Sequence, residues 1–182
     1  PSTTNRLRTQ LLYALELGRF ADARNLLQRV ERAYTARAET PPQDKLAVEY
    51  YAASLALADG KATAAEAAAR RSLAGFRELS LDKTEDMADA YEVLARSLLA
   101  QRRWADALEA AEAGLVIARA LAQREDYLAT RELPWIHAAM MLGRTDEARA
   151  RAIAARDVLA KYPGQPRGRA VIADLSTKLG LP

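Results

Sequence analysis

The sequence predicts an all-α solenoid of about four helix-turn-helix repeats, and three observations lead to that prediction. A short turn-like segment occurs four times, beginning at residues 18, 60, 102 and 143, so its spacing is 42, 42 and 41 residues. Each interval holds two stretches whose apolar residues recur three and four apart, the pattern of a helix with one buried face. Glycine and proline are few and lie mostly between these stretches. A fixed period of this length is typical of a helical repeat array.

The first two repeats are expected over residues 4–40 and 43–81. Gly18 and Gly60 stand where each pair of helices turns, because glycine readily adopts the left-handed conformation that closes many helices. Asp44 is a candidate N-cap for the second pair. The four helices of these repeats are expected over about residues 4–17, 20–38, 44–58 and 63–79.

The third and fourth repeats are expected over residues 84–123 and 125–162. Thr84 can cap the third pair, but Met87 stands where a full capping box needs Glu or Gln. The second helix of the third pair, which starts at Trp104 and reaches about residue 122, is expected to be the longest of the second helices.

Two features of the C-terminal part carry further expectations. Pro134 falls inside a predicted helix, where it lacks an N–H donor, so we expect a kink or a local break there with the carbonyl of Thr130 left unpaired. A last helix over about residues 167–179 has no partner helix in the pattern. Its Arg169, Asp174 and Lys178 would give it the polar outer face that a terminal cap of an array needs.

The composition limits the classes of protein that remain. The chain has 182 residues, 27 basic against 24 acidic side chains and no cysteine, so a disulfide framework and thiolate metal sites are excluded. No apolar run approaches the roughly 20 residues that a membrane-spanning helix needs, and no signal-peptide pattern opens the sequence. Because the chain starts at Pro1, we expect it to be a piece of a longer protein, which leaves its compartment open.

The turn segments resemble the Gly-x-Tyr-x-x-Ala core of the tetratricopeptide repeat (TPR). The clearest matches are Gly18-x-Phe20-x-x-Ala23 and Arg102-x-Trp104-x-x-Ala107. The small position of the motif is alanine in all four repeats, at Ala23, Ala65, Ala107 and Ala148. Ala62 replaces the aromatic residue in the second repeat. The period is longer than the usual 34 residues, as in the long-helix repeats of kinesin light chains and bacterial signalling proteins. HEAT and armadillo arrays, which share the longer period, are the alternative.

The resemblance implies a right-handed superhelix whose first helices line a concave groove, and therefore a set of groove positions. Transferred by register, they are Asn5, Arg8, Leu12 and Glu16 in the first repeat, Tyr50 and Ser54 in the second, Asp89, Glu92 and Arg96 in the third, and Thr130, His137 and Met141 in the fourth. The two-carboxylate clamp of chaperone-binding members needs lysine and asparagine. Here Leu12, Ser54, Arg96 and His137 stand at those places, so that specificity is not expected. The alternative for each residue is simple helix-to-helix packing.

The residues that could perform catalysis are few. His137 is the only histidine, and we expect it to line the groove or to lie half-buried beside Trp135. The glycines are dispersed and form no phosphate-binding loop. No cofactor, no metal ion and no enzyme activity are therefore expected.

The leading functional hypothesis is a protein-interaction scaffold that binds a peptide or partner domain in the groove, as a module of a larger bacterial signalling protein. A homodimerisation module is the alternative, with the outer face of the alanine-rich helix at residues 63–71 as a docking surface. Nucleic-acid binding is less favoured. Residues 143–182 are basic, but acidic residues interrupt the stripe and no aromatic residues are interleaved with it.

Overall fold

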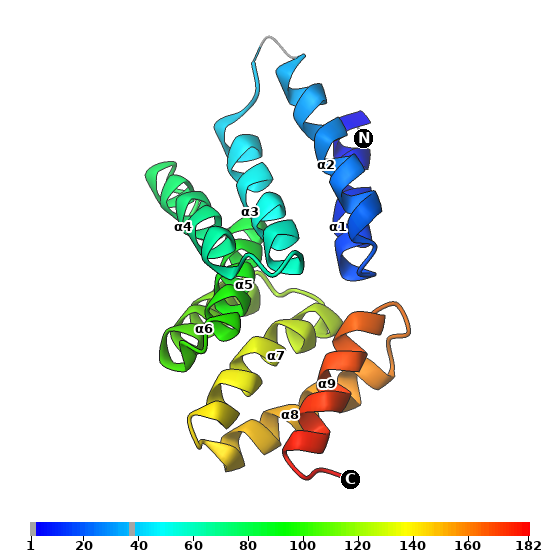
Figure 1. Cartoon of the computed structure of the whole chain (residues 1–182), viewed down its shortest axis with the longest axis vertical. Helices are drawn as coiled ribbons and strands as arrows, with labels where there is room; N and C mark the ends of the chain where they lie inside the picture. The colour runs from blue at the N-terminus through cyan, green and yellow to red at the C-terminus, as the bar shows by residue number, and fades with distance from the viewer. Residues whose placement is uncertain (1–2, 37–38) are drawn as a thin grey trace.

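The computed structural model describes residues 3–36 and 39–182 and shows nine α-helices in that part of the chain, with no strand. The helices follow one another as antiparallel pairs (Figure 1). Their bounds are α1 (Thr3–Glu16), α2 (Phe20–Thr35), α3 (Pro42–Ala58), α4 (Ala62–Glu78), α5 (Glu85–Ala100), α6 (Trp104–Ala120), α7 (Glu125–Met141), α8 (Thr145–Ala160) and α9 (Pro166–Lys178). The predicted all-α solenoid of four helix pairs and a terminal helix is confirmed.

The helices form two layers. Direct contacts run between α3 and α5, between α5 and α7 and between α7 and α9, in addition to those between chain neighbours. The first helix of each pair therefore lies in an inner layer and the second helix in an outer one. In the first repeat the inner helix α1 approaches α3 less closely than α3 approaches α5, and the gap is visible in Figure 1.

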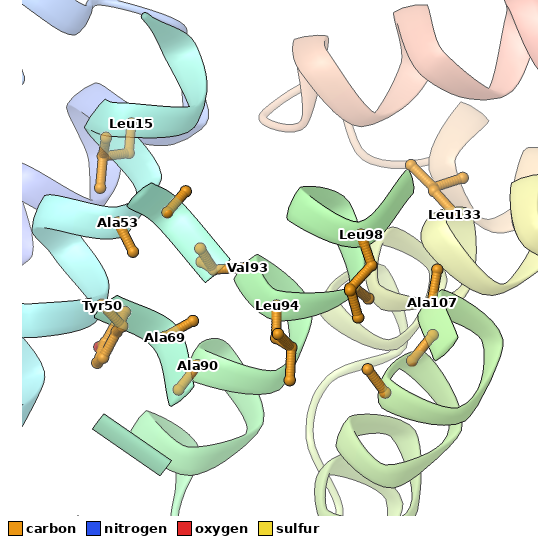
Figure 2. Close-up of a cluster of buried hydrophobic side chains, with 14 of the residues drawn as sticks. Leu15, Tyr50, Ala53, Ala69, Ala90, Val93, Leu94, Leu98, Ala107 and Leu133 are labelled. Atoms are coloured by element: carbon orange, nitrogen blue, oxygen red, sulfur yellow. The ribbon is translucent and has the colours of Figure 1, made fainter. Parts of the chain in front are cut away.

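Alanine sets the spacing of the two layers. Ala23, Ala65, Ala107 and Ala148, the small positions of the four turn motifs, are all fully buried. Figure 2 shows Ala107 beside Leu98 in the core between α5 and α6. Because alanine carries only a methyl group, the helices of a pair can pack closely at these positions, and larger side chains fill the space farther along each helix.

The four turns within pairs share one backbone conformation. Gly18, Gly60 and Gly143 have φ of 69°, 75° and 78°, and Arg102 has φ of 59° at the corresponding place in the third repeat. Arginine pays a steric penalty in this left-handed region that glycine avoids. The turn geometry is therefore kept even where the sequence lacks the residue that favours it.

Three helix boundaries differ from expectation. Asp44 is not an N-cap, because α3 already starts at Pro42 and Asp44 lies in its first turn. Helix α2 ends at Thr35, earlier than the predicted end near residue 38. Residue 38 itself lies outside the described residues. Helix α6 ends at Ala120, short of residue 122, and with 17 residues it shares the greatest length among the second helices with α4. Thr84 does cap α5, accepting a hydrogen bond from the backbone N–H of Met87 at 3.3 Å.

Pro134 does not break its helix. Helix α7 continues from Glu125 to Met141 without interruption. Pro134 cannot donate to the carbonyl of Thr130, and both residues line the concave side of the array. The helix thus accommodates the proline without a local break.

The terminal helix α9 is packed rather than isolated. It contacts α8 and α7, and Gly168 allows the close approach, since a Cβ there would lie 3.3 Å from Oγ1 of Thr130. Arg169, Asp174 and Lys178 are exposed, as expected for a cap. In the part of the chain that is described, none of the helices has the length and apolar character needed to cross a membrane.

The two ends of the array meet across the concave side. A guanidinium N–H of Arg167, at the start of α9, donates to the backbone carbonyl of Leu15 at 3.2 Å, and the same group lies 5.6 Å from the ring centre of Phe20. This contact joins residues 152 positions apart in the sequence. The concave space is therefore closed on one side by a contact between the cap and the first repeat.

Candidate interaction site on the concave face

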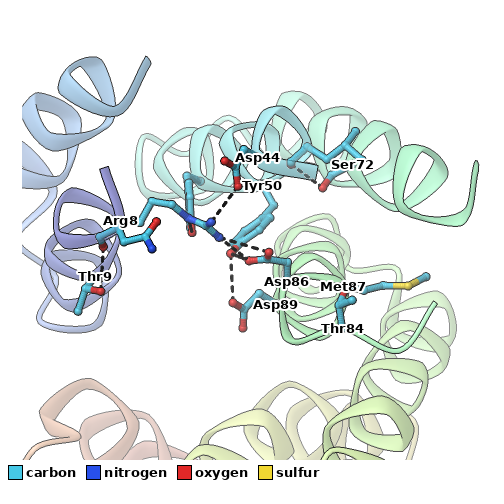
Figure 3. Close-up of polar contacts among 12 residues, drawn as sticks. Arg8, Thr9, Asp44, Tyr50, Ser72, Thr84, Asp86, Met87 and Asp89 are labelled. Atoms are coloured by element: carbon cyan, nitrogen blue, oxygen red, sulfur yellow. Dashed lines mark hydrogen bonds and ion pairs between the residues drawn. The ribbon is translucent and has the colours of Figure 1, made fainter. Parts of the chain in front are cut away.

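Arg8 connects the first three inner helices. Its guanidinium donates to Asp44 and Asp86 at 3.1 Å each and to the hydroxyl of Tyr51 at 3.2 Å. Figure 3 shows the side chain reaching from α1 toward both carboxylates. Since α1 and α3 approach each other only loosely, these charge-assisted hydrogen bonds hold the first repeat in place. Arg8 was predicted to face a ligand, but its guanidinium is instead used to hold neighbouring helices together.

Tyr50 continues the polar contacts into α5. Its hydroxyl lies 2.8 Å from Oδ1 of Asp86 and 3.2 Å from Oδ2 of Asp89. The side chain is 2% exposed, and burial, followed by the nearby Asp89, raises the pKa of the phenol well above its usual range. The expectation that Tyr50 faces the groove is corrected: its ring is part of the core and its hydroxyl is already bonded to the carboxylates behind the surface.

Arg131 extends the network to α7. It is 6% exposed, forms an ion pair with Asp89, lies 3.3 Å from a carboxylate oxygen of Glu92, and donates to Oε1 of Gln123 at 3.1 Å. Burial acts to lower its pKa, but the two carboxylates more than offset that effect and raise it. Arg131 therefore ties the third repeat to the fourth, as Arg8 ties the first to the second and third.

Two adjoining pockets open on the concave side. The larger, here called the apolar pocket, has a volume of about 340 Å³. Its walls come from α1, α3, α5, α7 and α9: Glu16, Leu57, Glu92, Arg96, Leu99, Ala100, Thr130, Leu133, Pro134, His137, Arg167, Gly168 and Val171. Its volume falls within the ~300–1,000 Å³ range of ligand sites, and aliphatic walls with a few charged groups are typical of such sites.

The smaller pocket, here called the acidic pocket, has a volume of about 190 Å³. It lies between α1, α5 and α7 and is lined by Thr9, Leu12, Tyr13, Glu16, Glu85, Asp89, Glu92, Tyr127, Thr130, Arg131 and Gln165. Glu16, Glu92 and Thr130 line both pockets. The two pockets are therefore neighbouring parts of one concave surface with different chemistry.

The predicted groove residues divide between these pockets and other places. Glu16, Glu92, Thr130, Arg96, His137, Leu12 and Asp89 line one or both pockets. Asn5 and Met141 are exposed at the ends of α1 and α7, and neither lines these two pockets. Ser54 donates its hydroxyl hydrogen to the backbone carbonyl of Tyr50 at 3.1 Å and also lies outside them.

His137 lies beside a different tryptophan from the one expected. Its ring centre is 6.0 Å from that of Trp104, whereas Trp135 is buried and packs under the guanidinium of Arg151 at 3.6 Å. Burial, followed by the charge of Lys178, lowers the pKa of His137. The imidazole is therefore a neutral group in the wall of the apolar pocket at pH 7.

Glu16 is a carboxyl group whose ionised form is disfavoured by its surroundings. It is half-buried and forms no ion pair with a described residue. Burial and the neighbouring Glu92 raise its pKa to about 7, against the opposing attraction of Arg167 and Arg96. Burial also raises the pKa of Asp89 to about 6, and there Arg131 opposes the shift. Negative charge is thus in excess where α1 faces α5.

This excess predicts a pH-dependent effect of Glu16→Gln. A carboxyl group whose pKa is higher in the folded chain destabilises that chain when ionised, so the penalty is full above pH 7 and disappears as the pH falls toward 4.5. Glu16→Gln should be more stable than wild type by about 1–2 kcal/mol at pH 8, with a difference that shrinks toward pH 5. Urea unfolding at pH 8, 6.5 and 5 measures it.

The opposing effect of His137, whose lowered pKa favours the folded chain at higher pH, is present in both proteins and cancels in the comparison. Glu78→Gln on the outer helix α4, where the carboxylate is exposed, is the control and should leave the stability unchanged at all three pH values. A Glu16→Gln variant that is less stable than wild type at pH 8 would show that Glu16 is held by a favourable interaction instead.

Four residues of the site with charged or amide side chains were missed in the sequence. Arg131 could have been found, because it lies one 42-residue step after Asp89 and carries the opposite charge. Glu85 stands on the predicted third repeat beside the chosen positions. Arg167 and Gln165 had no such signal, since only the closure of the array brings the start of α9 onto the concave side.

Most basic side chains of the C-terminal part are engaged in contacts within the chain. Within residues 143–182, all of which are described, Arg144 pairs with Glu147, Arg151 with Glu132, and Lys178 with Asp174. Arg149, Arg156, Arg167 and Arg169 donate to backbone carbonyl groups. The arginines therefore serve local contacts, which agrees with a solvated helix face.

Comparison with known proteins places the fold. No protein-family model matches the sequence, and no curated protein matches it. Two crystal structures of nearly identical TPR-like repeats from a protein assigned as a kinesin light chain of Podospora anserina are similar, with TM-scores of 0.63 and 0.62 at 22% and 21% identity. The matches cover 99% of this chain and 89% and 90% of those chains.

The apo form of RapI is similar with a TM-score of 0.65 at 14% identity, over 98% of this chain and 65% of RapI. This chain thus spans less than two thirds of the length of RapI. These identities relate the proteins through their fold, and the long-period repeats agree with the resemblance found in the turn motifs. The chain has the fold of a tetratricopeptide-like repeat array.

Proposed function

We propose that this chain is a non-catalytic protein-interaction module that binds an extended segment of a partner along its concave face. The observation that carries the proposal is the pair of adjoining pockets, which share Glu16, Glu92 and Thr130 and are lined by side chains of α1, α5 and α7. Two small adjoining pockets suit the side chains of a peptide or of the edge of a partner helix better than a globular surface.

The chemistry of the walls supports this role. The apolar pocket presents Leu57, Leu99 and Val171 to an incoming apolar side chain. Arg96 lies 3.8 Å from Glu92, too far for a hydrogen bond, so its guanidinium retains donors for a ligand. Arg167 also lines this pocket while its guanidinium donates to the carbonyl of Leu15, so the wall is braced between α9 and α1.

Two charge-changing variants test the concave face against the outer face. Arg96→Glu combined with Val171→Glu alters the apolar pocket. Arg29→Glu combined with Val116→Glu makes the same changes on the outer helices α2 and α6, where Arg29 is exposed and Val116 is 57% exposed. We expect the concave variant to recover a partner from lysate at least about tenfold less than wild type, and the outer variant to recover it normally.

Mass spectrometry of the captured proteins, with melting curves to verify the folding of both variants, gives the readout. Equal recovery by the concave variant together with loss in the outer variant would move the interaction surface to the outer layer and refute the proposal.

Self-association is the second candidate. Val116, Ile153, Met141 and Leu142 are exposed outside the two pockets. The outer face of the alanine-rich helix α4 is a weaker docking surface, because no large apolar side chain within α4 is exposed. Light scattering over a range of concentrations decides this point: a mass that stays at one chain at the highest concentration excludes homodimerisation.

A further inference from the structure

We infer that the acidic pocket receives the side chain of one lysine or arginine of the bound segment. The inference rests on the proposed function and adds the chemistry of one residue of the partner. Four carboxylates, those of Glu16, Glu85, Asp89 and Glu92, line this pocket against the single cation Arg131. The pocket is smaller than the ~300–1,000 Å³ of typical ligand sites, so it suits one long side chain.

The fold neutralises these carboxylates only in part. Arg131 contacts Asp89 and Glu92, and Arg96 lies 3.8 Å from Glu92, whereas Glu16 and Glu85 form no ion pair with a described residue. Burial, followed for Glu16 by the nearby Glu92, raises the pKa values of Glu16 and Asp89, so the ionised form of both groups is disfavoured in the free chain. A cation seated between these groups would supply the partner that the fold leaves out.

Gln165 is an independent sign of an absent donor. It is 6% exposed and forms part of the wall of the acidic pocket. Its Nε2 donates to Oδ2 of Asp126 at 3.4 Å, which fixes the orientation of the amide because an ionised carboxylate can only accept. Its Oε1 then has no hydrogen-bond donor. Buried acceptors without a donor are rare in folded proteins, and this one belongs to a residue of the pocket wall, so a donor of the ligand would satisfy it.

The remaining walls suit the stem of a long cationic side chain. Leu12, Tyr13 and Tyr127 line the pocket and are exposed. Lysine and arginine carry an aliphatic stem that packs on apolar surface while the charged head reaches polar groups, and aromatic rings also attract the cation itself. A neutral side chain could pack here or donate a hydrogen bond, but it would lack the charge attraction of the carboxylates, and an acidic side chain would be repelled by them.

A displayed library of random octapeptides, selected on the 182-residue chain, tests the inference. The wild type, a Glu16→Gln/Glu85→Gln variant and a Glu31→Gln/Glu78→Gln control are compared. The control removes the same charge from exposed positions of α2 and α4. We expect peptides selected on wild type and control to carry lysine or arginine at one shared position, and this preference to disappear on the pocket variant.

The contribution of the cationic residue to the binding affinity is measured with one selected peptide and with its analogue in which norleucine replaces that residue. The replacement should weaken binding to wild type by about tenfold or more, as expected for the loss of a charge-assisted hydrogen bond. It should change binding to the pocket variant much less. Melting curves verify that all three proteins are folded.

The outcomes separate the two proposals. Selected peptides without a preferred cationic position, or with a preference that the pocket variant retains, would overturn the inference and leave the proposed function standing. A library that yields no binding peptide on a folded chain would overturn both.

Discussion

Arg131→Met is expected to lower the free energy of unfolding by about 3–5 kcal/mol, the cost of breaking a buried ion pair from one side. Methionine fills a similar space but leaves the carboxylates of Asp89 and Glu92 without their cation. Gln123 also loses the donor to its Oε1. Urea unfolding at pH 7.5 measures the loss, and we expect the interface between α5 and α7 to unfold first in hydrogen exchange.

Two comparisons make the result specific to buried charge. Adding Asp89→Asn and Glu92→Gln to Arg131→Met should restore about 2 kcal/mol or more, because neutral amides do not require the cation. Arg19→Met removes an exposed pair with Asp22 and should cost less than about 1 kcal/mol. If Arg131→Met costs no more than Arg19→Met, the concave network does not hold the third and fourth repeats together.

Ala107→Leu is expected to lower the free energy of unfolding by about 2–3 kcal/mol, the upper part of the usual range for overpacking a core. Ala107 is fully buried at the small position of the turn motif, against α5. A leucine there must push α5 and α6 apart or adopt an unfavourable rotamer. Circular dichroism in increasing urea gives the change in unfolding free energy.

Ala105→Leu is the matched control, since it makes the same change on the exposed side of the same turn of α6. We expect it to stay within about 0.5 kcal/mol of wild type. If Ala107→Leu is tolerated, this position does not set the spacing of the helix pair. The match to the repeat motif would then have no structural consequence at this position.

The repeat architecture was predictable because it depends on short-range patterns in the sequence. Gly18, Gly60 and Gly143 mark turns through their backbone freedom, and the buried alanines recur at one register position. Even the turn at Arg102, which lacks glycine, could be placed from its neighbours. The sequence predicted a kink or a local break at Pro134. The break does not occur, and α7 continues through the proline with α6 and α8 packed against it.

The site was less predictable because it depends on contacts across repeats. Register placed Glu16, Glu92 and Thr130 on the concave side, but it could not tell a side chain that faces a ligand from one that holds neighbouring helices, as Arg8 and Tyr50 do. The part contributed by α9 depends on closure between residues far apart in the sequence. No periodic pattern records such a contact.

Hydrogen exchange on the chain with and without a selected octapeptide tests the central claim most directly. If the concave face binds the partner, the peptide should slow exchange in the inner helices α1, α5 and α7, whose side chains line both pockets, and leave the outer helices α2, α4, α6 and α8 unchanged. Slower exchange confined to the outer helices, with the inner layer unaffected, would contradict the account.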